Sequence, residues 1–118
     1  MPDSLLENIN RELREFAIER DWEQFQSPKN VAMALIVEAA ELVEHFQWLT
    51  EEQSYQLNKE KLTEVSYEMA DIMIYLLRLS DRLGVDLLAV VQEKMKLNAE
   101  KYPAEKVRGS AKKYTEYR

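Results

Sequence analysis

LIVEAAELVEHFQW, residues 35–48, is the stretch that decides the fold, because it sets Glu38 and Glu41 inside an apolar run typical of a buried helix. A buried ionised carboxylate is costly unless it is paired or bound to a metal. At about 100° per residue, four side chains of this run share a stripe roughly 80° wide: Glu38, Glu41, His45 and Trp48. The run therefore predicts a helix whose carboxylates need a partner elsewhere.

The composition around this run favours helices. The chain has 118 residues, 46% hydrophobic and 32% charged, which suits one domain with one hydrophobic core. Two glycines and three prolines leave little turn chemistry, whereas residues with high helix propensity are abundant. We expect an all-α protein with a single domain over residues 1–118.

Capping signals divide the chain into four main helices. Ser4 and Glu7 have capping-box spacing and predict a first helix over about residues 4–20. Ser27 before Pro28 starts the second helix, which should end near residue 46 or 47. Residues 48–60 form a connection, in which Thr50 and Gln53 predict a short helical turn.

The third predicted helix is the longest, and Gly84 ends it as a left-handed residue. Its predicted core face comprises Leu62, Val65, Met69, Ile72, Met73, Leu76 and Leu83. Asp86 caps a fourth helix over about 87–101, and a basic irregular tail follows from about residue 103. These helices predict an antiparallel four-helix bundle, and the all-round apolar run DIMIYLLRL (71–79) predicts a homo-oligomer.

Charge is divided unevenly along the chain. The net charge is −6, which argues against a nucleic-acid polymer as the main partner. Residues 94–118 hold eight basic and three acidic side chains, whereas the rest holds eight basic and nineteen acidic ones. An acidic body with a basic end suits a small anion bridged to carboxylates by a cation.

Cellular location follows from what the sequence lacks. It has no cysteine, which fits a reducing compartment and excludes a thiolate metal site. It also has neither the pattern of a signal peptide nor an apolar stretch of membrane-spanning length. We expect a cytoplasmic protein with no membrane partner.

A second carboxylate pair lies on the third predicted helix. There, four side chains share a stripe roughly 60° wide: Glu64, Glu68, Asp71 and Tyr75. Glu68 with Asp71 repeats the spacing of Glu38 with Glu41, and buried like charges at this spacing are unfavourable without a cation. Four oxygen ligands select Mg²⁺, with Mn²⁺ as a substitute, and point to phosphate esters or anhydrides as substrates.

The carboxylates have two other interpretations, of which the first stays open and the second is excluded. They could be solvated charges on otherwise buried helices, although their apolar neighbours make this less favourable. A di-iron site needs Glu-x-x-His motifs. The only histidine, His45, has Leu42 three positions before it, so that motif is not encoded. We interpret His45 as a surface or interface residue.

Aromatic and basic residues supply candidate contacts for a nucleotide. Trp22 and Trp48 flank the second helix and could stack on a base, or could simply pack the ends of the bundle. Tyr75, one turn beyond Asp71, has the better position to line a cavity. The basic end is either a solvated tail or a partner for the phosphates of a metal-bound substrate.

The motifs EAAE (38–41) and EMAD (68–71) resemble the signature of the all-α, MazG-like nucleoside triphosphate pyrophosphohydrolases. The segments FAIERDWEQF, FQW, DIMIYLLRL, KMKLNAEKYP and RGSAKKYTEY resemble the dCTP pyrophosphatase branch of that family, in order and over nearly the whole chain. The resemblance implies hydrolysis of a nucleoside triphosphate to the monophosphate and pyrophosphate. It also implies dimers or tetramers with binding sites built between chains.

The resemblance assigns roles to individual residues. It implies Mg²⁺ ligands at Glu38, Glu41, Glu68 and Asp71. One of the carboxylates activates water, and we favour Glu41 or Glu44. The implied substrate contacts are Trp22 and Trp48 for the base, Tyr75 and Asn98 for the nucleoside, and Lys94, Lys101 and Tyr102 for the phosphates; Lys29, Arg108 and Lys112 are weaker candidates.

One position departs from the family, and one rival function stays open. The animal enzymes of the branch have a histidine where this chain has Leu13, which leaves the base preference open among deoxynucleotides. The rival is a non-catalytic helical-bundle interaction module that dimerises through the third helix. Such a module has no reason to bury two carboxylate pairs. An enzyme acting on another pyrophosphate compound is a further alternative.

Overall fold

The computed structural model describes residues 4–111, and these form helices and turns without a strand. The helices are α1 (Leu5–Glu19), α2 (Pro28–Glu44), α3 (Glu51–Ser54), α4 (Lys59–Leu83), α5 (Leu87–Lys101) and α6 (Ala104–Val107). A 3-10 turn, Glu23–Phe25, lies between α1 and α2. The all-α prediction is confirmed, and each main helix ends within three residues of its predicted boundary.

Local capping sets these boundaries. The Ser4 hydroxyl accepts from the Glu7 N–H at 3.1 Å, and the Ser4 N–H donates to the Glu7 carboxylate at 3.0 Å, which completes a capping box. Thr50 and Gln53 form a second capping box at the start of α3. Gly84 ends α4 with φ 68°, a left-handed conformation that costs glycine little.

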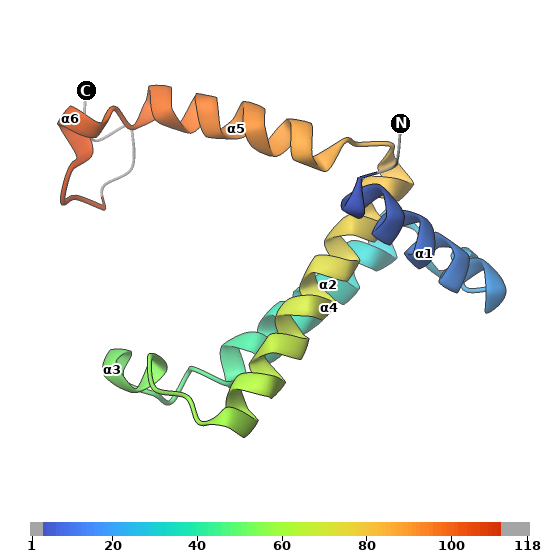
Figure 1. The fold of residues 1–118 in the computed structure, drawn as a ribbon, viewed down its shortest axis with the longest axis horizontal. Helices are drawn as coiled ribbons and strands as arrows, with labels where there is room; N and C mark the ends of the chain where they lie inside the picture. The colour runs from blue at the N-terminus through green and yellow to red at the C-terminus, as the bar shows by residue number, and fades with distance from the viewer. Residues whose placement is uncertain (1–3, 112–118) are drawn as a thin grey trace. The chain divides into compact units, whose positions relative to one another are not determined.

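Two long helices, α2 and α4, lie side by side and antiparallel (Figure 1). The contacts at their two ends establish the direction: Gln26, just before α2, bonds Arg78 late in α4, whereas His45 at the end of α2 contacts Lys61 early in α4. Helix α1 also packs on α4. The buried apolar side chains among the described residues are Ala17, Val31, Val65 and Leu77.

Most of the predicted core face of α4 is exposed in the single chain. Val65 is buried and Ile72 is partly buried, but Leu62, Met69 and Met73 each retain more than half of their maximal exposure. The 3.6-residue period marks which side of a helix is apolar, but not what covers it. Large exposed apolar patches are uncommon on soluble proteins, so this face of α4 is a candidate contact surface.

The chain divides after Gly84 into two units. The first holds α1 to α4, and the second, from Val85 on, holds α5 and α6. The N-cap Asp86 accepts from the Ala89 N–H at 3.2 Å and starts α5. Helix α6 is a single turn inside the segment expected to be irregular. A single domain over residues 1–118 stays a prediction, and no helix within residues 4–111 is long and apolar enough to cross a membrane.

Candidate metal centre

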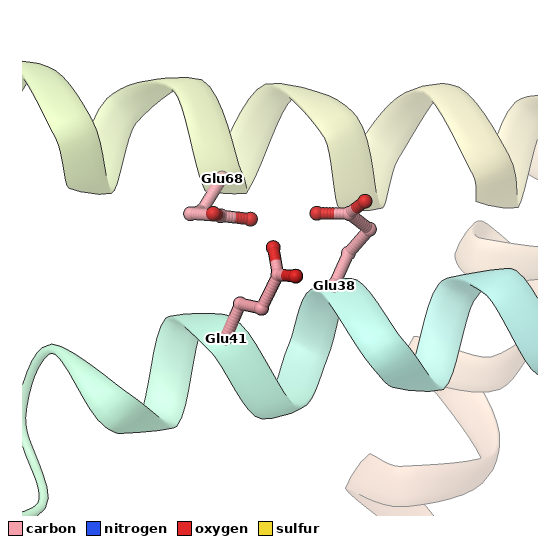
Figure 2. Close-up of side chains that lie close together, drawn as sticks. All are labelled: Glu38, Glu41 and Glu68. Carbon is pink, nitrogen blue, oxygen red and sulfur yellow. The ribbon is translucent and has the colours of Figure 1, made fainter.

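Three carboxylates meet in the space between α2 and α4. Glu38 and Glu41 extend from α2, and Glu68 extends toward them from α4 (Figure 2). Each offers one oxygen, and these oxygens lie within 4.8 Å of one another. The i, i+3 spacing puts the first two on one side of α2, and the antiparallel packing brings Glu68 opposite them. Residues distant in sequence thus form one acidic group.

The pKa values of these side chains reflect their crowding. Hydrogen bonding to Glu68, then desolvation and the nearby Glu41, raise the pKa of Glu38 to about 7. For Glu68, the hydrogen bond with Glu38 lowers the pKa, but desolvation and the carboxylates of Glu41 and Asp71 outweigh it and raise the pKa overall. Two carboxylates can share a hydrogen bond only when one holds a proton. The group therefore retains a proton, or requires a cation, near neutral pH.

A divalent cation fits this group. Glu68 Oε2 is buried and has no hydrogen-bond partner among residues 4–111, and buried polar atoms are rarely left unpaired. With Mg–O distances of about 2.0–2.1 Å, two ligands of one Mg²⁺ lie about 3.0 Å apart when adjacent and about 4.2 Å apart when opposite, so the three oxygens must move closer together to bind one ion. Three carboxylate ligands suit a hard cation and leave sites for water and phosphate.

Asp71 and Glu44 lie outside the three-carboxylate group. Asp71 is exposed and follows Glu68 by one turn on α4. Its charge still helps raise the pKa values of Glu68 and Tyr75, so it belongs to the same electrostatic environment. Glu44 is the last residue of α2 and is exposed. Membership of Asp71 in the ligand set and a base role for Glu44 stay predictions.

A cavity of about 280 Å³ lies between α1, α4 and the turn before α2. It is lined by Leu13, Phe16, Trp22, Gln26, Asp71, Ile74, Tyr75 and Arg78. Burial, followed by repulsion from Glu38 and Asp71, raises the pKa of the Tyr75 hydroxyl. Tyr75 therefore adjoins both the cavity and the carboxylates, and two predicted substrate-binding residues, Trp22 and Tyr75, share one cavity.

The position of Trp22 follows from how α1 ends. The Trp22 N–H donates to the Ala17 carbonyl at 2.9 Å and the Asp21 N–H to the Ile18 carbonyl at 3.1 Å, the pattern of a Schellman motif. Asp21 takes the left-handed position with φ 54°. The chain then reverses, and the Trp22 ring packs edge-on against Phe16 with centroids 5.7 Å apart. Without a glycine at residue 21, the sequence gives little sign of this turn.

The other predicted contacts are distributed along the chain. Trp48 lies beyond the far end of α2 and is 87% exposed. The 17 residues of α2 span about 25 Å, so one copy cannot hold the same base between Trp22 and Trp48. Lys29 is exposed in the first turn of α2. His45 is largely buried, with Nδ1 lying 3.3 Å from Lys61 Nζ and 3.9 Å from Glu64.

The basic segment, residues 94–118, belongs to the second unit. Lys94, Asn98 and Lys101 follow one face of α5 at spacings of four and three residues, and Tyr102 is the C-cap of that helix. Arg108 follows α6. Lys112 lies outside the described residues. Contacts of all these side chains with substrate stay predictions.

Sequence reasoning missed two polar residues of the cavity, Gln26 and Arg78. Arg78 is 3% exposed, although it carries a charge, and its Nε donates to Gln26 Oε1 at 3.0 Å. The available signal was the arginine inside the apolar run DIMIYLLRL, where a charge is unexpected. Gln26 lies in an irregular segment and gives no comparable signal.

Comparisons with known proteins agree with the all-α fold and identify a family. The MazG-like family matches residues 33–117. Human dCTP pyrophosphatase 1 is 43% identical over 117 residues, which cover 98% of this chain and 69% of the human protein. The rat protein of that name is 44% identical over 119 residues with the same coverage. The crystal structure of a pyrophosphatase from Archaeoglobus fulgidus matches with a TM-score of 0.82 and 36% identity, covering 87% of this chain and 96% of that one.

Proposed function

This chain belongs to the MazG-like family, and from that membership we propose that it hydrolyses a deoxynucleoside triphosphate, dCTP or a close relative, to the monophosphate and pyrophosphate. The family resemblance seen in the sequence is confirmed. The similarity to proteins named dCTP pyrophosphatase 1, over 98% of this chain, supports the substrate class. It also favours an enzyme over a non-catalytic interaction module.

The observation that carries the proposal is the group of Glu38, Glu41 and Glu68 between α2 and α4. We propose that these carboxylates hold Mg²⁺, which Mn²⁺ can replace. When bound, the ion would neutralise charge on the phosphate oxygens and make the phosphorus more electrophilic. The pKa of Glu38 is raised to about 7, so Glu38 can hold a proton near neutral pH. A cation that binds to the three carboxylates displaces this proton.

The chain's own side chains orient the substrate in this proposal. Trp22 and Tyr75 line the cavity together with Asp71 and position the nucleoside. Asn98 of α5 contacts the nucleoside. Lys94, Lys101 and Tyr102 contact the phosphates. Glu41, or alternatively Glu44, accepts the proton of the attacking water. In-line attack requires this alignment of water, phosphorus and leaving group.

We also propose that the site is completed by self-association. Exposed apolar side chains on both long helices support this: Met33, Ile36 and Val37 on α2, and Met69 and Met73 on α4. A second copy that covers them could bring its own Trp48 to the base, which resolves the separation of the two tryptophans. A cytoplasmic location likewise stays a prediction.

The proposed activity is tested by product analysis. The protein is incubated with dCTP and Mg²⁺, and dCMP with pyrophosphate is separated from dCDP with phosphate. We expect dCMP and pyrophosphate, lost with EDTA and in Glu41→Ala, but kept in Glu60→Gln, which removes an exposed carboxylate of α4 that is not part of the three-carboxylate group. Side-by-side rates for dCTP, 5-methyl-dCTP, dUTP, dATP and dTTP define the base preference. Failure to cleave any of them would argue for the interaction module.

Self-association is tested separately. Sedimentation analysis of the wild type should give more than one copy per particle, and Met73→Glu should shift it toward the single chain, because a charge on the apolar face opposes burial. Thr63→Glu, at an exposed polar position of the same helix, serves as the matched control. A wild type that sediments as a single copy at all concentrations would contradict self-association.

A further inference from the structure

Arg78 is a buried charge with an incomplete set of partners. Its side chain is 4% exposed, and burying a guanidinium is costly unless its nitrogens are bonded. Nε donates to Gln26 Oε1 at 3.0 Å, and Nη1 donates to Asp81 Oδ2 at 3.1 Å. Asp81 is itself held from α1, because Arg14 Nη2 lies 2.6 Å from its Oδ1. Two of the three guanidinium nitrogens are thus bonded, one to Gln26 before α2 and one to Asp81 of α4.

The third nitrogen, Nη2, has a different environment. It is buried and has no hydrogen-bond partner among residues 4–111. A counter-charge, Glu23 Oε1, lies 3.9 Å from this nitrogen, which is within ion-pair range but too long for a hydrogen bond. Because buried donors are nearly always satisfied, this nitrogen points to an acceptor supplied by another molecule.

The cavity beside Arg78 indicates what that molecule is. Arg78 and Gln26 form part of the wall of the 280 Å³ cavity, whose other walls are mainly apolar and aromatic. A mainly apolar cavity with a few fixed polar groups is typical of a site for a small ligand, and aromatic walls suit the flat ring of a base. The same cavity contains Trp22 and Tyr75, the residues proposed above to position the nucleoside.

We propose that Arg78 is a specificity-determining residue whose Nη2 donates a hydrogen bond to the 2-oxo oxygen of a pyrimidine base. The inference rests on the proposed function, because cytosine, the base of the proposed substrate, has its only carbonyl at C2. Uracil and thymine carry the same oxygen. Gln26 is a positioning residue, since its carboxamide oxygen fixes the orientation of the guanidinium. A site built around a buried donor penalises a base that leaves the donor unpaired.

The test changes one atom of the substrate and one residue of the protein together. Wild type, Arg78→Met and Arg78→Lys are assayed with dCTP and with 2-thio-dCTP, in which a weaker sulfur acceptor replaces the oxygen. We expect the wild type to prefer the oxygen compound by about three- to tenfold in kcat/KM, and Arg78→Met to lose about ten- to a hundredfold with dCTP, mainly through KM. In Arg78→Met, the ratio of kcat/KM for dCTP to kcat/KM for 2-thio-dCTP should fall to about one. Arg78→Lys should restore part of the wild-type ratio.

Arg82→Met is the matched control. Arg82 is a second arginine of α4 that reaches the same segment, since its Nε donates to the Gln26 carbonyl at 2.9 Å, but it does not line the cavity. This variant should keep the wild-type ratio of oxygen to sulfur substrate. If the role of Arg78 were purely structural, Arg78→Met would lower kcat/KM equally for both substrates. The ratio of the two kcat/KM values would then stay unchanged.

The outcomes separate this inference from the function on which it rests. If the wild type cleaves dCTP and 2-thio-dCTP equally, Arg78 does not contact the 2-oxo group and the inference is overturned, whether or not the variants fold. If the wild type cleaves dCTP with a clear preference for oxygen that Arg78→Met retains, another residue reads the base. If no nucleoside triphosphate is cleaved, the proposed function fails and the inference falls with it.

Discussion

Mg²⁺ binding should weaken about tenfold between pH 8 and pH 6, because the ion competes with a proton at Glu38. Hydrogen bonding to Glu68 raises the pKa of Glu38 to about 7. The apparent Kd is multiplied by one plus the ratio of protonated to ionised Glu38, a factor of about 1.1 at pH 8 and about 11 at pH 6. The ratio of these two factors gives the expected change.

The assay is calorimetric titration with Mg²⁺ at pH 6, 7 and 8. Repeating each titration in two buffers with different protonation enthalpies counts the protons released, which should be about 0.9 per ion at pH 6 and about 0.1 at pH 8. Glu38→Gln should bind more weakly and lose the pH dependence. Glu60→Gln, which removes an exposed carboxylate of α4, should retain it. An apparent Kd that is equal at pH 6 and pH 8 would refute the reasoning.

The same proton affects stability without metal. The pKa of Glu38 is raised above its unfolded value, so the native state holds a proton that the unfolded chain has already lost. Stability without metal should therefore fall as the pH rises from about 4.5 to about 7. Thermal melts in EDTA should show this decline, and excess Mg²⁺ should reverse it above pH 7. A flat profile in EDTA would contradict the shared proton.

Three further changes test the site and the fold. Glu41→Ala should lower dCTP turnover by at least about a hundredfold, because the carboxylate group loses a ligand, while far-ultraviolet circular dichroism stays unchanged. Leu77→Ala should cost about 2–5 kcal/mol in urea unfolding, because Leu77 is 2% exposed and its removal leaves a cavity. Gly84→Ala should cost about 1 kcal/mol, measured by the same unfolding, because φ is 68° and no neighbouring atom is close enough to add a clash.

The sequence by itself determined the local structure. Helix starts at Ser4, Ser27 and Asp86 follow from side-chain oxygens that accept from backbone N–H groups three residues later, an interaction that needs only nearby residues. The end of α4 follows from Gly84 in the same way. The two carboxylate pairs were equally visible in the motifs EAAE and EMAD, because each motif spans only four residues.

Contacts between helices decided the rest. The packing of α2 on α4 brings Glu68 into the group with Glu38 and Glu41 and leaves Asp71 outside it, although periodicity alone puts Glu68 and Asp71 on one stripe. A helical stripe spans tens of degrees, whereas metal ligation depends on differences of about an ångström, and these are fixed by how two particular helices approach. The unpaired nitrogen of Arg78 depends on Gln26, 52 residues away, and no local pattern encodes such a pair.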